Sequence, residues 1–237
     1  RMLRVILKND KIKVRKVSVQ QWLQNLYGHS AQLDILAEDE NGTQFNVEIQ
    51  RSDEGASVQR ARFYCGALDM HFLDKGKKYE TLPDAYVIFI TETDVLKNGR
   101  PLYHIQRSVD ETGEAFGDGS HIVYVNAACQ DDTPLGRLMQ DFNCSNPAKM
   151  HYKELADTVN YFKSTKEGEI DMTDIIEMYA KNYAEKVAEK AAEKAAHQSN
   201  VEVAKNLLAE GMSEDFIVRT TKLSLEEVRE LMAKQSA

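Results

Sequence analysis

Cysteine is scarce in this chain, and long apolar runs are missing. The 237 residues include only Cys65, Cys129 and Cys144, an odd number without the spacing of a disulfide framework or a zinc site. This pattern predicts buried thiols in a reducing, cytoplasmic setting. No stretch of about eighteen apolar residues is present, so no membrane partner is expected. Residues 1–16 also lack the layout of a signal peptide.

The signatures of several other site types are also absent. Neither a Walker-type phosphate loop nor a dinucleotide fingerprint occurs, and the GDGS segment at residues 117–120 is too short to cradle phosphate. The histidines that could hold a metal form no pair at ligand spacing: His29, His71, His104 and His121.

The net charge limits the class of nucleic-acid binder. A formal charge of −8 argues against strong non-specific binding of DNA. The charge is uneven, however, because residues 1–16 carry +6 and residues 167–193 carry −5. The basic stretch has two interpretations: a rim that contacts DNA, or ordinary solvated charge.

The order of predicted elements indicates an α/β fold. A strand is predicted over residues 14–19, and two more form a hairpin over residues 33–50. Apolar residues at helical spacing predict a helix over residues 56–74. The short apolar run 86–91 suits a buried central strand. Two further strands, over 102–109 and 121–126, complete a mixed sheet flanked by helices.

The hairpin is the most informative segment. Glu40-Asn41-Gly42 suits a three-residue loop that ends in a left-handed glycine. This loop pairs Asp39 with Thr43 and sets Asp34 opposite Glu48. One face is then apolar, with Leu33, Ile35, Ala37, Phe45, Val47 and Ile49. A two-residue Asn41-Gly42 turn would move Glu48 onto that face, so the first register is favoured by burial.

The two acids are a candidate metal site. Asp34 and Glu48 would lie roughly 5 Å apart at Cβ. Carboxylates this close repel unless a cation joins them, and Mg²⁺ or Mn²⁺ prefers oxygen ligands while keeping water positions open. The alternative is a solvated polar face with two incidental acids, and the hairpin alone does not decide between the two.

A resemblance favours the metal site. Asp34, followed after thirteen residues by Glu48-Ile49-Gln50, resembles the PD-(D/E)XK nuclease signature in its Glu-x-Gln form. The surrounding YGHSAQLDILAEDENGTQFNVEIQRSDEGASVQRARFY is similar to the recombination-promoting nuclease and transposase-like branch of that superfamily. The similarity continues through LPDAYVIFIT, LYHIQRSVDETGEAFGDGSHIVYVN and YKELADTVNYFK, and covers about residues 25–180.

This resemblance implies a fold, a reaction and a site. The fold would be a restriction-endonuclease-like core, and the reaction metal-dependent hydrolysis of DNA that promotes recombination. It implies that Asp34 and Glu48 bind Mg²⁺ or Mn²⁺, with the Ile49 carbonyl completing the site. Gln50 would position the attacking water.

The chain departs from the family pattern at two positions. Leu33 stands where proline is common, and Gln50 stands where lysine is usual. Lysine would bring a positive charge to the scissile phosphate, whereas glutamine brings only a dipole. The metal must therefore carry more of the charge stabilisation. Such families also tend to have an acidic residue on a helix before the hairpin, and this chain shows no clear candidate.

The helix after the acids is a candidate DNA-contacting element. Arg60 and Tyr64 share one face at i and i+4, with Gln59 beside them. Arginine forks match phosphate oxygens. The expected DNA-binding residues are Arg51, Gln59, Arg60, Arg62 and Tyr64. The alternative is an ordinary helix surface that pairs with Asp53 and Glu54.

The chain is expected to have three parts. Residues 1–148 form the nuclease-like core, residues 149–197 a helical extension with an Ala/Glu/Lys-rich connector, and residues 198–237 a helix-turn-helix-like tail. The last two make up a C-terminal all-helical extension.

The tail is expected to contact protein more readily than DNA. Gly211 ends one helix, Ser213 starts a second, and a capping box from Ser224 to Glu227 opens a third. Glutamates at the start of that third helix would meet phosphates and repel them. Self-association is therefore a candidate role, giving a homo-oligomer through the C-terminal helices.

Three functional hypotheses follow. The first is an active DNA endonuclease, the second a DNA-binding protein of the same fold with impaired cleavage, and the third an interaction protein whose tail is the working part.

Overall fold

The computed structural model of the chain describes residues 1–23, 30–50, 53–163 and 172–235. Contacts divide the chain into two compact units, residues 1–184 and residues 185–237. The expected boundaries after residues 148 and 197 stay predictions.

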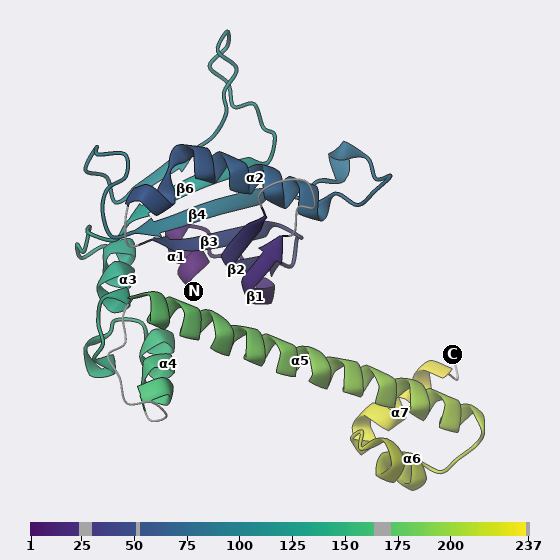
Figure 1. Ribbon diagram of the computed structural model, residues 1–237. Helices are drawn as coiled ribbons and strands as arrows, with labels where there is room; N and C mark the ends of the chain where they lie inside the picture. Colours follow the sequence, from purple (N-terminus) through teal and green to yellow (C-terminus); the bar gives the residue numbers. More distant parts are fainter. Residues whose placement is uncertain (24–29, 51–52, 164–171, 236–237) are drawn as a thin grey trace. The chain divides into compact units, whose positions relative to one another are not determined.

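A six-stranded sheet forms the centre of the first unit (Figure 1). The strands lie in the order β1-β2-β3-β4-β6-β5, and β3-β4 and β4-β6 are parallel while the other neighbours are antiparallel. The sheet is therefore mixed, as the order of elements predicts. The strands are β1 Val14–Leu23, β2 Ala31–Asp39, β3 Gln44–Gln50, β4 Ala85–Thr91, β5 Leu102–Ile105 and β6 Ser120–Asn126.

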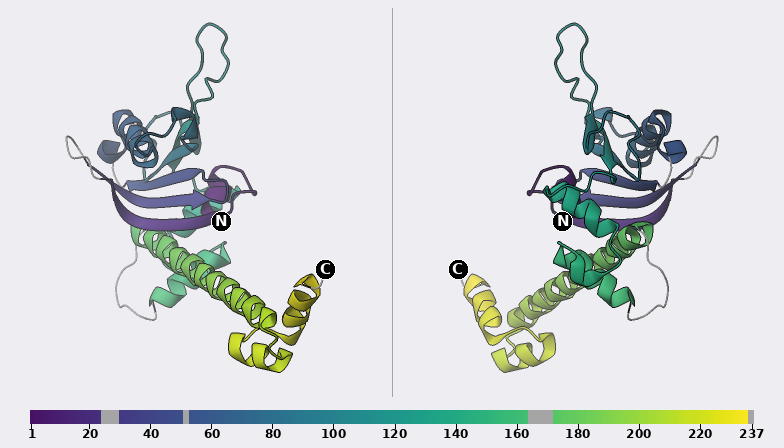
Figure 2. Two further views of the ribbon diagram at one scale, coloured as in Figure 1. Left: turned by 90° about the vertical axis from the view of Figure 1, so that its right-hand side faces the viewer. Right: turned by 90° about the vertical axis from the view of Figure 1, so that its left-hand side faces the viewer.

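Helices cover both faces of this sheet (Figures 1 and 2). α2, Val58–Phe72, packs on one face through Ala61, Cys65 and Leu68. The opposite face is covered by α1 Met2–Ile6, α3 Pro134–Phe142 and the first turns of α5 Met172–Ala209, and α4 Lys153–Lys163 adds side chains to the same core. Because β4 is buried between the two layers, its continuous apolar run is explained. Three short 3₁₀ helices lie at Asp53–Ala56, Tyr79–Thr81 and Pro147–Lys149.

The hairpin has the predicted register. The Asp39 amide donates to the Thr43 carbonyl (3.1 Å), and β2 pairs with β3 from Ile35 with Val47 to Glu38 with Gln44. Gly42 adopts φ +87°, the left-handed conformation that the three-residue loop requires. Phe45, Val47 and Ile49 face the core shared with α1, α3 and α5.

The prediction that Leu33 lies on the same face of the sheet as Ile35 is wrong. Leu33 packs under α2, whereas Ile35 packs on the opposite face with Val47. Alternation along β2 therefore breaks at Asp34, between these two residues. The break coincides with Gln20 of β1, which has φ +51° and interrupts the β1–β2 pairing opposite Asp34.

The connection between β5 and β6 is a long loop that projects from the sheet (Figures 1 and 2). The strand expected to reach Val109 ends at Ile105. An isolated bridge between Ser108 and Ala115, with an ion pair from Arg107 to Asp118, closes the base of the loop.

The second unit is a small helical bundle. The end of α5 packs with α6 Glu214–Thr221 and α7 Leu225–Gln235 around buried Ala204, Ile217, Leu223 and Val228. The predicted capping box opens α7, because the Ser224 amide and hydroxyl donate to Glu227 Oε2 and the Glu227 amide donates to Ser224 Oγ. Within the described ranges, no helix combines the length and apolarity of a membrane span.

Candidate functional site

The two predicted acids lie where the β2–β3 ladder opens. The pairs between these strands stop at Ile35 and Val47, and the next pair would be Asp34 with Glu48. β3 also lies beside β4 in parallel, so Gln50 aligns with Thr91 at the carboxyl ends of these strands. In open α/β sheets, ligands bind outside such carboxyl ends.

Each acid accepts a hydrogen bond from the opposite strand. The Asp34 amide donates to Glu48 Oε1 (3.2 Å), and the Ile49 amide donates to Asp34 Oδ2 (2.9 Å). These two bonds replace backbone pairing at the point where the ladder opens. Each carboxyl group therefore lies against the strand of the other acid, and the charge of Asp34 acts on Glu48.

Glu48 is the more buried of the two acids. Its side chain is 0% exposed, and burial, together with the negative charge of Asp34, raises the pKa of Glu48 to about 8. Burial also raises the pKa of Asp34, although the Ile49 amide and the positive charge of Arg60 act in the opposite direction. Two neighbouring carboxyls that resist ionisation together are typical of functional sites.

Arg60 of α2 faces Glu48 from the helix layer. Its Nη2 lies 3.6 Å from Glu48 Oε2, an ion-pair distance that is too long for a hydrogen bond. The Arg60 guanidinium also donates to the Tyr64 hydroxyl and to the Gly55 carbonyl. The Tyr64 hydroxyl in turn donates to the Gln32 carbonyl (3.4 Å). Arg60 and Tyr64 therefore contact each other on α2 as predicted, and Arg60 lies at ion-pair distance from Glu48.

Gln50 lies beside the 3₁₀ turn that follows β3. A Cβ placed at Gly55 would collide with Gln50 Oε1, so a larger residue at position 55 would force the end of the Gln50 side chain to move. Because strand side chains alternate, Gln50 projects to the same face as Glu48. The end of the Gln50 side chain therefore lies against the turn that contains Gly55, whose carbonyl accepts a hydrogen bond from Arg60.

The other predicted DNA-contacting residues are less closely tied to the acids. Gln59 and Arg62 are exposed on α2, and only Arg60 and Tyr64 join the network around Glu48. Arg51 lies outside the described residues. In the basic N-terminal stretch, Lys13 and Arg15 form ion pairs with Glu40 and Glu38 of the hairpin.

One acidic residue near the site was missed by sequence reasoning. Glu177 lies on α5, and burial together with the negative charge of Asp34 raises its pKa. Its neighbours Ile175 and Ile176 are buried in the core that also contains Ile35 and Ile49. No local signal marks Glu177, because it lies far from Asp34 along the chain.

The chemistry of the acid pair fits a divalent cation. Glu48 Oε2 is buried and accepts no hydrogen bond of good geometry from the described residues, although the Asn46 side chain is close enough to act against the rise in the Glu48 pKa. Such an atom is costly without a proton or a cation. Two carboxylates and a backbone carbonyl are ligands that Mg²⁺ and Mn²⁺ accept. Within the described part of the chain, no three acidic, histidine or cysteine side chains gather closely enough to hold a metal. Water would therefore fill the remaining positions.

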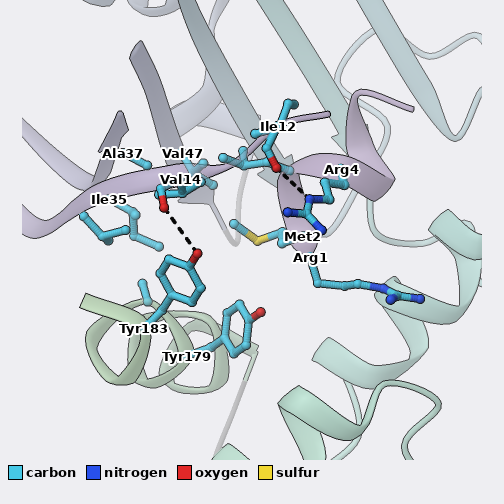
Figure 3. Close-up of a pocket in the computed structure, with 13 residues that line it drawn as sticks. Arg1, Met2, Arg4, Ile12, Val14, Ile35, Ala37, Val47, Tyr179 and Tyr183 are labelled. Atoms are coloured by element: carbon cyan, nitrogen blue, oxygen red, sulfur yellow. Dashed lines mark hydrogen bonds between the residues drawn. The ribbon is translucent and has the colours of Figure 1, made fainter. Parts of the chain in front are cut away.

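A separate cavity of about 60 Å³ lies on the face of the sheet opposite to α2 (Figure 3). Ile35 and Val47 line it from the sheet, and Tyr179 and Tyr183 line it from α5. The Tyr183 hydroxyl donates to the Val14 carbonyl (3.4 Å), and the Arg4 guanidinium donates to the Ile12 carbonyl. No carboxylate is among its lining residues, so this cavity does not suit a cation.

Comparison with known proteins identifies the family. A family model described as PD-(D/E)XK nuclease family transposase matches residues 1–133, which is more than half of the 237 residues. No curated protein and no solved structure matches the chain. The matched region contains the hairpin, both acids and α2, and its mixed sheet with flanking helices is consistent with this fold. The chain belongs to the PD-(D/E)XK nuclease family transposases.

Proposed function

We propose that this protein is a metal-dependent DNA endonuclease that hydrolyses phosphodiester bonds. The observation that carries the proposal is the pair of carboxylates at the opening of the β2–β3 ladder, where Glu48 Oε2 is buried without a hydrogen bond of good geometry from the described residues. Family membership supports nuclease-like function, with DNA as substrate and a divalent metal as cofactor.

Each residue of the site has a proposed role. Asp34 and Glu48 would hold Mg²⁺ or Mn²⁺, and the Ile49 carbonyl would complete the protein ligands. A cation bound there supplies positive charge for the phosphate and acidifies a water molecule. Gln50 would orient the attacking water through its side-chain amide, which can donate and accept hydrogen bonds but carries no charge.

α2 would form the near part of the DNA-binding surface. Arg60 is the best supported of the proposed contacts, because it is partly exposed and joins the network around Glu48. The expected contact by Tyr64 does not fit its burial, since its side chain is enclosed and its hydroxyl binds Arg60. The remaining proposed contacts to the phosphate backbone are Arg51, Gln59 and Arg62. A role in recombination and a cytoplasmic location remain part of the proposal.

The second candidate is a DNA-binding protein with impaired cleavage. It is favoured by one observation, that Gln50 is neutral where the family pattern has lysine. In this case the acids and α2 would still bind DNA, while turnover would be limited by the missing charge. Partner binding or self-association through α6 and α7 is the third candidate.

Nicking of supercoiled plasmid with Mg²⁺ or Mn²⁺ tests the proposal. We expect the full chain to cut, and Asp34→Ala and Glu48→Ala each to abolish cutting. Asp132→Ala is a matched control, because Asp132 is an exposed acid that pairs with Arg137 on α3. Cutting that survives in either site variant would refute the assignment. Binding in a gel-shift assay without cutting would favour the second candidate, and neither binding nor cutting the third.

A further inference from the structure

Arg60 of α2 carries a positive charge close to the acids, whereas Gln50 carries none. Arg60 Nη2 lies 3.6 Å from Glu48 Oε2, so a guanidinium already stands beside the acid pair. The Glu48 side chain is fully buried, whereas the Arg60 side chain is 36% exposed. Arg60 is therefore the member of this pair that solvent and a dissolved anion can reach.

Arg60 is held in this position by several contacts. Its Nε and Nη2 donate to the Tyr64 hydroxyl (3.0 and 2.7 Å), and its Nη1 donates to the Gly55 carbonyl (2.9 Å). The guanidinium carbon also lies 5.1 Å from the centre of the Tyr64 ring. These contacts fix the orientation of the guanidinium, which reduces the entropy lost when it binds an anion.

The same contacts keep Arg60 from closing fully on Glu48. A salt bridge made to stabilise the fold would normally use a bidentate, hydrogen-bonded geometry. Here the donors of Arg60 are directed at Tyr64 and Gly55, and the carboxylate is left at ion-pair distance. A guanidinium has five N–H donors, so it can hold these three bonds and still donate to another oxygen.

We propose that Arg60 has two roles at this site. In the cation-free protein it is the counter-ion of Glu48 when that carboxyl is ionised, and in the cleavage reaction it supplies to the phosphate the positive charge that Gln50 cannot provide. Tyr64 is a positioning residue that acts through Arg60. This inference rests on the proposed nuclease function and extends it to the substrate charge.

The first role is tested by titrating the protein with Mn²⁺ in a calorimeter, in the absence of DNA. Arg60→Gln removes a unit charge that competes with the cation, so Mn²⁺ should bind about fivefold tighter, the usual size of a partly exposed ion-pair effect. Arg137→Gln on α3 is the matched control, and it should leave Mn²⁺ affinity unchanged. Unchanged or weaker Mn²⁺ binding in Arg60→Gln would overturn the counter-ion role.

The second role is tested by plasmid cleavage and by moving the charge. Arg60→Gln should slow cleavage about a hundredfold, as expected when one donor that faces developing charge is removed. The double variant Gln50→Lys with Arg60→Gln should recover most of that loss, because it restores a cation at the usual position of the family lysine. Failure of this rescue in a folded double variant would overturn the phosphate role.

Tyr64→Phe tests positioning, because it keeps the ring and removes the hydroxyl. Cleavage should fall in the wild-type background and should not fall further in the Arg60→Gln background. Additive losses would show that Tyr64 acts independently of Arg60. If Arg60→Gln does not fold, Arg60→Lys is used in its place. The lysine keeps the positive charge but cannot make the guanidinium bonds to Tyr64 and Gly55, so Arg60→Lys should slow cleavage without tightening Mn²⁺ binding.

The failure of this inference can be told from the failure of the proposed function. Absence of cleavage by the unchanged protein with Mg²⁺ and with Mn²⁺ refutes the nuclease. Normal cleavage by the unchanged protein, together with normal cleavage and normal Mn²⁺ affinity in Arg60→Gln, refutes only the roles of Arg60.

Discussion

Replacing Glu48 by glutamine should change the pH dependence of stability of the first unit. Burial and the charge of Asp34 raise the pKa of Glu48 from 4.5 to about 8 in the folded protein. The charged groups that face Glu48 are Asp34, Arg60 and, at high pH, Tyr64. Between the two pKa values the folded chain keeps a proton that the unfolded chain has released.

The sign of the effect follows from this difference. Below about pH 4.5 both states are protonated, so the stabilising contribution of Glu48 is fully present. As the pH rises toward 8, ionisation of Glu48 lowers the free energy of the unfolded state, and the stabilising contribution of Glu48 is lost. Each pH unit in this window is worth about 1.4 kcal/mol, so the total loss is roughly 3 to 5 kcal/mol. The glutamine in Glu48→Gln cannot ionise, so this variant should not show the loss of stability with rising pH.

Urea unfolding in EDTA at steps from pH 5 to 9 measures the effect. Trp22 is the single tryptophan of the chain and lies in the first unit, so its fluorescence follows that unit alone. We expect the two proteins to have similar stability near pH 5 and Glu48→Gln to be the more stable near pH 8. Glu111→Gln is a control, because Glu111 is an exposed glutamate of the projecting loop.

Parallel stability curves for Glu48→Gln and the unchanged protein across this range would refute the reasoning, because they would mean that Glu48 ionises with an ordinary pKa. Mn²⁺ gives a second reading of the same group. A cation that binds the ionised carboxylate should stabilise the unchanged protein more at pH 8 than at pH 5, and should stabilise Glu48→Gln little at either pH.

Three further predictions concern other parts of the molecule. Gly55→Ala should displace the flexible Gln50 side chain and slow cleavage by at least about tenfold, while calorimetry shows unchanged Mn²⁺ affinity. Glu177→Gln removes a negative charge near Asp34 and should weaken Mn²⁺ binding by about twofold to fivefold; tighter binding would contradict the proximity. Ser224→Ala removes both hydrogen bonds of the Ser224 hydroxyl in the capping box of α7 and should lower local stability by about 1 kcal/mol, measured by amide hydrogen exchange in α7.

The hairpin could be predicted because several local signals agree. The loop Glu40-Asn41-Gly42 specifies a left-handed glycine, and one register alone places the apolar residues of β3 in the core. α2 and the capping box at Ser224 were predictable for the same reason, since helical spacing and capping residues act over a few positions.

The interruption at Asp34 could not be predicted in this way. Perfect alternation would place Leu33 and Ile35 together, but the left-handed Gln20 on the neighbouring strand changes the side to which Leu33 points. Nothing in the sequence around Gln20 marks this conformation, because glutamine rarely adopts it. Glu177 was missed for a related reason: only tertiary packing of α5 brings it near Asp34.

The crossed bonds between the two acids and the opposite strand have a spectroscopic consequence. The amide protons of Asp34 and Ile49 each point at a carboxylate oxygen of the site. Ionisation or ligation of either acid changes the electric field at these two protons before any larger rearrangement is needed. Their nuclear magnetic resonance signals should therefore act as a built-in sensor of occupancy, readable without DNA and without turnover.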